Sequence, residues 1–145
     1  MSEIDRMDPG QESQPWSIHR VGVVGMGLIG GSIALDLTQQ GVEVQGLVHR
    51  EVTAERARSR GLAPLVSTDP SCLQDCDLVI LALPLESLLT PEESLLNALP
   101  EHAVVTDVGS VKAEVLAVWR DLHPRFVGSH PMAGTAQAGV DAGLP

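Results

Sequence analysis

The sequence has few aromatic residues and few cysteines. Trp, Phe and Tyr make up 2% of the 145 residues, and Tyr is absent. The core must therefore be built from aliphatic side chains, and the hydrophobic content of 43% is typical of a globular domain. Cys72 and Cys76 are too few for a disulfide framework. They would hold a metal only with a second ligand pair, which the nearby sequence does not offer, so we expect two reduced thiols.

Positive charge and long apolar runs are also scarce. Lys and Arg number 9 against 19 Asp and Glu, for a formal net charge of -10. Nucleic-acid binding needs a basic face, so the composition argues against a nucleic-acid partner. Spanning a bilayer takes roughly 18 or more apolar residues, and the longest run here, 78–83, is only as long as a strand. We therefore expect no membrane partner.

The first 17 residues lack the apolar segment of a signal peptide. They are polar and rich in acidic side chains, which also disfavours an organellar transit peptide. We predict a mobile tail over 1–17 and a single dinucleotide-binding domain over 18–145. The absence of a leader and of paired cysteines predicts a cytoplasmic protein.

Beyond the tail, apolar runs alternate with segments of helical spacing. Strands are expected at 19–25, 43–48, 62–66, 77–84, 102–110 and 126–127. Helices are expected at 28–41, 51–61, 86–99 with a break at Pro91, and 111–122. This alternation predicts an α/β fold, a Rossmann-type doubly wound and mainly parallel sheet with helices on both faces. Ligands of such sheets bind at the carboxyl ends of the strands.

The segment GMGLIG, residues 25–30, fits the pattern G-x-G-x-x-G between the first strand and the first helix. Gly25 permits a tight turn, Gly27 lets a pyrophosphate approach the backbone, and Gly30 lets the helix pack closely on the strand. The N–H groups at the helix start attract phosphate. The same glycines could serve turn and packing without a ligand, but their context favours dinucleotide binding. The candidate cofactor-binding residues are Gly25, Met26, Gly27, Leu28, Ile29 and Gly30.

The end of the second strand lacks the acidic residue that usually holds the ribose hydroxyls of NAD. His49 and Arg50 stand there instead. An arginine can grip a 2′-phosphate through paired hydrogen bonds, so NADP is favoured and NAD is the alternative. Glu51 beside it keeps NAD open, and Arg50 could also be a solvated residue that opens the next helix. His49 is a candidate neighbour of the adenine or ribose.

Two further motifs, VTDVGSVK at 105–112 and VGSHPMAGT at 127–135, follow the turn GMGLIGGS. Together they make the chain, from about residue 21 to its end, resemble the prephenate/arogenate dehydrogenase family. The resemblance implies an NAD(P)-dependent oxidative decarboxylation of a small-molecule cyclohexadienol in tyrosine biosynthesis. It also implies a second, helical domain that forms a homodimer and supplies an arginine for the substrate carboxylate. No such domain is found in these 145 residues, so we expect them alone to bind nucleotide weakly and to turn over little substrate.

The resemblance also implies roles for single residues. His130 matches a base that takes up the ring-hydroxyl proton while hydride passes to the nicotinamide, a task that suits a histidine with an ordinary pKa near ~6.5. Ser110 matches a serine that bonds the hydroxyl or the histidine beside the nicotinamide, and Thr135 is a weaker candidate for substrate contact. Without the motif, His130 would be a strand-end residue with a satisfied hydrogen bond.

Other roles stay open for neighbouring residues. Ser110 could instead cap a helix that starts at 111. Asp107 is expected to orient its loop or to help solvate it. Lys112 could contact a phosphate or the substrate, but a surface charge is the favoured expectation. The remaining histidines are expected at the surface: His19, His49, His102 and His123. Two alternative functions remain: a β-hydroxyacid-type dehydrogenase, which shares the glycine turn, and an NADP-binding module without catalysis.

Overall fold

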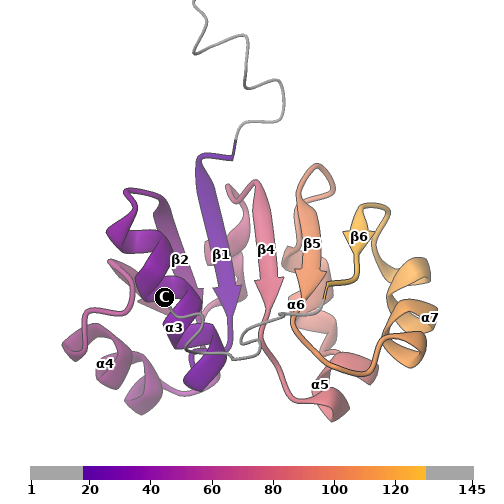
Figure 1. Ribbon diagram of the computed structural model, residues 1–145, viewed down its shortest axis with the longest axis horizontal. Helices are drawn as coiled ribbons and strands as arrows, with labels where there is room; N and C mark the ends of the chain where they lie inside the picture. Colours follow the sequence, from indigo (N-terminus) through magenta and orange to yellow (C-terminus); the bar gives the residue numbers. More distant parts are fainter. Residues whose placement is uncertain (1–17, 130–145) are drawn as a thin grey trace, which may run out of the picture.

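A computed structural model describes residues 18–129 of the chain. Six strands form one sheet in the order β3-β2-β1-β4-β5-β6, and every neighbouring pair is parallel (Figure 1). The strands are β1 (Arg20–Val24), β2 (Glu43–Leu47), β3 (Leu65–Ser67), β4 (Leu78–Leu81), β5 (Val104–Asp107) and β6 (Phe126–Val127). The order reverses between β1 and β4, which opens a crevice at their carboxyl ends. The predicted doubly wound parallel sheet is confirmed.

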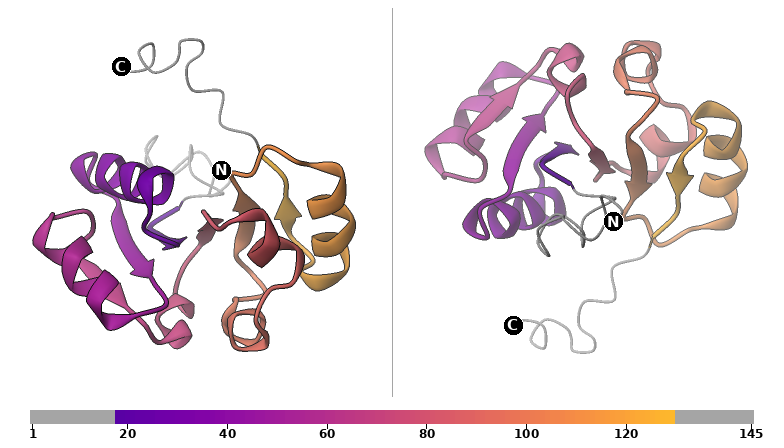
Figure 2. Two further views of the ribbon diagram at one scale, coloured as in Figure 1. Left: turned by 90° about the horizontal axis from the view of Figure 1, so that it is seen from below. Right: turned by 90° about the horizontal axis from the view of Figure 1, so that it is seen from above.

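Helices cover both faces of the sheet. They are α3 (Leu28–Gln39), α4 (Glu51–Ser59), α5 (Leu85–Leu89), α6 (Glu93–Ala98), α7 (Ala113–Leu122) and the short 3-10 helix η1 (Pro70–Leu73). In Figure 2, the indigo-to-magenta helices α3 and α4 lie to one side of the sheet and the orange-yellow helix α7 lies to the other. The connection between any two successive parallel strands must cross over a face, and helices fill those crossovers.

The strands are apolar on both sides because each face has its own core. Neighbouring residues of one strand, such as Val23 and Val24, belong to different clusters. The cluster under α3 and α4 contains Ala34, Val44, Ala54, Ala57 and Ile80, among others. The cluster under η1, α5, α6 and α7 contains Leu73, Val79, Leu88, Leu95 and Trp119, among others. Burial on two faces explains why strand 78–81 shows no alternation.

Several boundaries differ from the expected ones. β3 starts at Leu65 because Pro64 has no N–H to give to a ladder. The break expected at Pro91 is confirmed, since α5 and α6 are separate helices. η1 was not expected, although its cause is local: the Asp69 carboxylate accepts a hydrogen bond from the Ser71 N–H at 3.0 Å, and Pro70 starts the helix.

His123 was expected at the surface, and this was wrong. Only 6% of it is exposed. Its ring bridges two main-chain groups: Nε2 donates to the Pro100 carbonyl at 2.8 Å, and Nδ1 accepts from the Arg125 N–H at 3.1 Å. The Pro100 carbonyl lies 23 residues away in the sequence, so the residues around His123 carried no signal for this burial. His19, His49 and His102 are exposed as expected.

The two cysteines are free thiols in the cluster under η1. Cys76 is buried and Cys72 is half-buried. Burial raises the pKa of each thiol to about 11, so both stay protonated and unreactive near neutral pH. Within 18–129, no group of three or more His, Cys, Asp or Glu side chains is placed to hold a metal, and no helix is long and apolar enough to cross a membrane.

Candidate functional site

The turn between β1 and α3 has two glycines that the fold itself requires. Gly25 has a φ of 94°, and a Cβ built on it would lie 2.4 Å from the Ala82 carbonyl oxygen. A Cβ on Gly30 would lie 1.9 Å from the Gly25 carbonyl oxygen. Any larger residue at either position would therefore push the turn and α3 away from the end of β4. These two glycines would be needed whether or not a ligand binds.

Gly27 is different, because nothing in the described structure requires a glycine there. Its φ of -75° suits any residue, and a Cβ built on it would meet no atom within 4 Å. The space in front of Gly27 is open, and the residue is the N-cap of α3. A side chain at this position would occupy that open space. The arrangement fits a group that approaches the backbone from outside, as the pyrophosphate of a dinucleotide does.

The amino end of α3 is suited to an anion. Gly27 provides no side-chain cap, and no acidic residue lies in the first turn of this 12-residue helix. The first N–H groups of a helix lack partners inside it and carry partial positive charge. Two apolar side chains are exposed beside them, Leu28 at 88% and Ile29 at 49%. Met26, in contrast, packs its buried side chain over Gly46, so only its main chain would meet a phosphate.

A cleft of about 730 Å³ opens where the strand order reverses. Three segments far apart in sequence line it: 27–30 at the start of α3, 82–85 after β4, and 108–111 after β5. The structure thus brings Ser110 together with the glycine turn, as the sequence predicted. The cleft wall is largely apolar, and it includes the exposed side chains of Leu28, Leu85 and Val111. Segments 82–85 and 111 were not among the candidates, because their apolar residues resemble ordinary core.

A smaller cleft of about 200 Å³ lies at the ends of β1 and β2. It is mainly apolar, and its lining residues include Val24, Leu47, Val48, Thr68 and Leu95. His49 also lines it, which places this exposed imidazole beside a mainly apolar space. Such a space would suit an adenine ring.

Arg50 follows His49 at the end of β2, is exposed, and forms the N-cap of α4. The neighbouring Glu51 carboxylate is bonded to the Arg58 guanidinium at 3.0 Å. The same guanidinium donates to the Val66 carbonyl at 2.8 Å, which holds the pair against β3. Glu51 is therefore engaged along α4, and Arg50 has no ion pair within the described part of the chain.

A third cleft, of about 480 Å³, lies between α3 and α4 beside the glycine turn. Thr53, Arg56 and Arg60 line it together with Met26 and Gly27, among other residues. Segment 50–60 holds four arginines of the nine Lys and Arg residues in the chain. Positive charge is thus concentrated next to the end of β2, in a chain whose net charge is -10. The sequence shows this concentration, but not that Thr53 and Arg56 face the turn.

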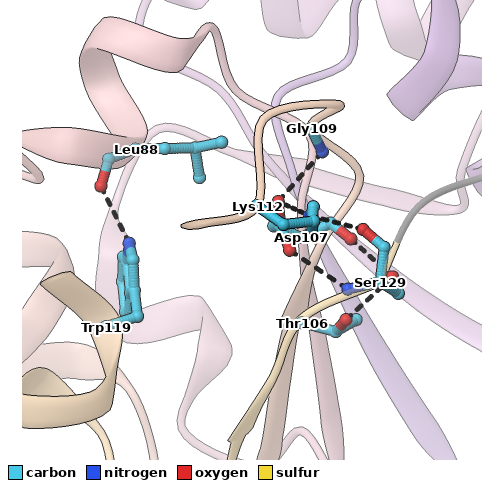
Figure 3. Close-up of polar contacts among 7 residues, drawn as sticks. All are labelled: Leu88, Thr106, Asp107, Gly109, Lys112, Trp119 and Ser129. Carbon is cyan, nitrogen blue, oxygen red and sulfur yellow. Dashed lines mark hydrogen bonds and ion pairs between the residues drawn. The ribbon is translucent and has the colours of Figure 1, made fainter. Parts of the chain in front are cut away.

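The loop after β5 is shaped by Asp107, whose side chain is fully buried. Its Oδ2 accepts a hydrogen bond from the Gly109 N–H at 3.0 Å, so Asp107 orients the loop as expected. Lys112 was expected to be a surface charge, and this was wrong: it is 26% exposed and forms an ion pair with Asp107 (Figure 3). The alternative role of Ser110 as a helix cap is also wrong, because α7 begins at Ala113 with Lys112 as its N-cap.

His130 and Thr135 lie outside the described residues. Ser129, which precedes His130 in the sequence, is described and is bonded to Asp107. The segment that leads to His130 therefore reaches the same loop that carries Ser110. The described part of the site thus consists of the glycine turn and Ser110 around one cleft, with His49 and Arg50 at the next strand end.

The family model described as the prephenate dehydrogenase nucleotide-binding domain matches residues 33–145. A cyclohexadienyl dehydrogenase from Zymomonas mobilis is 32% identical over 129 residues, which are 86% of this chain and 44% of the relative. The matched segment therefore spans less than half of this relative.

Solved structures of similar sequence also share the fold. Synechocystis arogenate dehydrogenase is 37% identical with a TM-score of 0.68, over 81% of this chain and 42% of the other. The prephenate dehydrogenase from A. aeolicus in complex with hydroxyphenyl propionate and NAD+ is 32% identical with a TM-score of 0.72. That match covers 86% of this chain and 46% of the other.

Proposed function

The chain belongs to the prephenate dehydrogenase family, and we propose that it forms the nucleotide-binding part of an enzyme that oxidatively decarboxylates arogenate or prephenate. The bound cofactor would accept a hydride from the ring carbon that carries the hydroxyl. Carbon dioxide would leave from the opposite ring carbon, and the ring would become aromatic. Such a step belongs to tyrosine biosynthesis.

The observation that carries this proposal is the shared cleft of the glycine turn and the DVGSVK loop. Gly27 leaves open space at the amino end of α3, where a pyrophosphate would lie. Ser110 borders the same cleft, so its hydroxyl would stand within the reach of a cofactor bound there. A nucleotide-binding module without catalysis needs the first of these features but not the second.

The proposed chemical roles follow from the chemistry of the side chains. Loss of hydride would leave positive charge on the hydroxyl-bearing carbon, and removal of the hydroxyl proton would stabilise it. We assign that proton to His130 and assign to Ser110 a hydrogen bond to the hydroxyl or to the histidine. Thr135 would contact the substrate. The apolar walls around Leu28, Leu85 and Val111 would exclude water from the ring.

The preferred cofactor is proposed to be NADP. Arg50 stands where NAD-binding domains usually carry an acid, and the nearest carboxylate, Glu51, is engaged with Arg58. Arg50 would therefore meet a 2′-phosphate without competition from Glu51. Arg56 and Arg60 line the cleft on the same side of the turn and would add to its positive potential.

The chain spans less than half of the relatives that it matches, and we propose that turnover needs a helical domain joined to it. That domain would supply the group that holds the substrate carboxylate and would form a homodimer. The 145 residues by themselves would bind NADP weakly and would not produce tyrosine from arogenate at a measurable rate.

The decisive experiment is a steady-state assay of the full-length gene product with arogenate and prephenate, each with NAD and NADP. We expect turnover with NADP, and we expect His130→Ala to lower kcat by about 10²-fold or more while the KM for NADP stays within a factor of about two. A His130→Ala enzyme with normal kcat would refute the assigned base. A protein that binds NADP and turns over neither substrate would instead be a binding module.

A further inference from the structure

The Asp107 carboxylate is a buried charge with three partners (Figure 3). Oδ2 accepts from the Gly109 N–H at 3.0 Å and from the Lys112 ammonium, and Oδ1 accepts from the Ser129 N–H at 3.3 Å. A carboxylate without exposure is costly unless it is paired and hydrogen-bonded. An apolar residue would fill the end of β5 without this requirement. The charged pair therefore calls for a role beyond filling space.

Ser129 is held at each of its polar groups by the same short segment. Its hydroxyl donates to the Asp107 carbonyl at 2.6 Å and accepts from the Thr106 hydroxyl at 3.0 Å. Its N–H reaches the Asp107 carboxylate, and its carbonyl oxygen accepts from the Lys112 ammonium. All of these partners come from 106–112, about twenty residues earlier in the chain. Ser129 thus has its orientation set by the loop after β5.

The bond to the Ser129 carbonyl has a consequence for the next residue. A peptide unit is planar, so a fixed Ser129 C=O would constrain how the chain continues into His130. Lys112 joins that carbonyl to the Asp107 carboxylate. The same lysine lies two positions after Ser110 in the sequence, so one side chain ties together the two segments that carry the candidate catalytic groups.

We propose that Asp107 and Lys112 are positioning residues for His130, and this rests on the proposed function. Neither side chain lines the proposed cofactor cleft. They act by holding the Ser129–His130 peptide relative to Ser110. Loss of either residue would shift the base from its working position, and a misplacement of about 1 Å can cost about 10²-fold in rate.

The test is a double-mutant cycle in the full-length gene product, assayed with arogenate and prephenate in the presence of NADP. Lys112→Met keeps the aliphatic stem and removes the ammonium. We expect it to lower kcat by about 10²-fold while the KM for NADP stays within a factor of about two, because the glycine turn is untouched. In a His130→Ala background the same change should lower kcat by less than about threefold, since there is no base left to position.

Three variants sharpen the result. Lys112→Arg restores a cation and a donor and should recover part of kcat. Arg20→Met breaks an ion pair with Glu43 (3.0 Å) at the amino ends of the strands, and it should leave kcat unchanged. If Lys112→Met does not fold, Thr106→Val removes only the bond to the Ser129 hydroxyl and should give a smaller loss of kcat, again only when His130 is present.

The outcomes separate the two proposals. A large loss in His130→Ala with normal kcat in Lys112→Met would refute the positioning role and leave the proposed function standing. Equal losses from Lys112→Met with and without His130 would mean that Lys112 acts on its own, which also refutes positioning. Normal kcat in His130→Ala would refute the assigned base and the positioning role with it.

Discussion

The indole N–H of Trp119 donates a hydrogen bond to the main-chain carbonyl of Leu88 at 2.8 Å, and both residues are fully buried (Figure 3). The bond joins α7 to α5. α5 begins at the end of the 82–85 segment and α7 follows the Ser110 loop, so this contact ties together two walls of the large cleft. Trp119 also stacks on Phe126, with ring centroids 5.3 Å apart.

Replacement of Trp119 should therefore destabilise the domain. Trp119→Phe keeps an aromatic ring but leaves the buried Leu88 carbonyl without its donor, which costs about 1–3 kcal/mol of the free energy of unfolding. Urea denaturation followed by circular dichroism measures the change. Val127→Ala, at a residue that is 56% exposed, is the control and should shift the free energy by less than about 0.5 kcal/mol. Equal stability of Trp119→Phe and wild type would show that the bond contributes nothing.

Alanine substitution should affect two glycines of the same turn differently, one through stability and the other through cofactor binding. Gly30→Ala places a Cβ against the Gly25 carbonyl and should destabilise the fold, whereas Gly27→Ala meets no neighbouring atom and should cost less than about 1 kcal/mol. Gly27→Ala should instead weaken NADP binding by at least about tenfold, or ~1.4 kcal/mol, because its methyl group enters the space for the pyrophosphate. Calorimetric titration and urea unfolding of both variants check this pair. Full NADP affinity in Gly27→Ala would argue against a pyrophosphate at that position.

Arg50→Ala should change the choice between cofactors. Loss of a charge-assisted bond to a 2′-phosphate costs about 1.5–3 kcal/mol, so the Kd for NADP should rise by roughly tenfold to a hundredfold while the Kd for NAD stays nearly constant. Arg120→Ala, at an exposed arginine on α7, is the matched control and should change neither Kd. If Arg50→Ala weakens both cofactors equally, Arg50 does not read the 2′-phosphate.

Acid should weaken the fold through Asp77. Its Oδ2 accepts hydrogen bonds from the N–H groups of His19 at 2.9 Å and Arg20 at 3.1 Å, and these bonds lower the pKa of the carboxyl below its ordinary value of 3.8. A lowered pKa in the folded state means that the stabilisation is present above pH 3.8 and is lost as the pH falls through the folded-state pKa.

Urea unfolding at several values between pH 3 and pH 6 measures this effect. This range of about three units includes the ordinary carboxyl pKa. Asp77→Asn should be less stable than wild type at pH 6, and the difference should shrink toward pH 3. Asp36→Asn, at an exposed residue on α3, should leave the pH dependence close to that of wild type. A constant difference between Asp77→Asn and wild type at every pH would rule out the linkage.

Much of the architecture could be predicted from the sequence because the relevant signals are local. Strand 78–81 is apolar without alternation, as a strand buried on both faces must be. The glycines at 25 and 30 were assigned to a tight turn and to close helix packing, and the structure shows both needs as atomic contacts. The break at Pro91 follows from the missing N–H of proline.

Residues whose surroundings depend on how separate segments come together could not be placed in this way. Nothing near His123 indicates that its ring would bridge the Pro100 carbonyl and the Arg125 N–H. Lys112 resembled a solvated charge at a helix start, and its pairing with buried Asp107 depends on how the loop after β5 turns. Burial is a property of the assembled fold, so single segments do not reveal it.

The sequence by itself determined the order of strands and helices, the glycine-rich turn and the family motifs, because each depends on residues within a few positions of one another. The tertiary structure decided which of these motifs meet. The parallel sheet with its reversal at β1 and β4 brings 27–30, 82–85 and 108–111 to one edge and forms a cleft that no segment forms alone. It also decided that Asp107 and Lys112 hold Ser129, since that contact needs β5, its loop and β6 side by side.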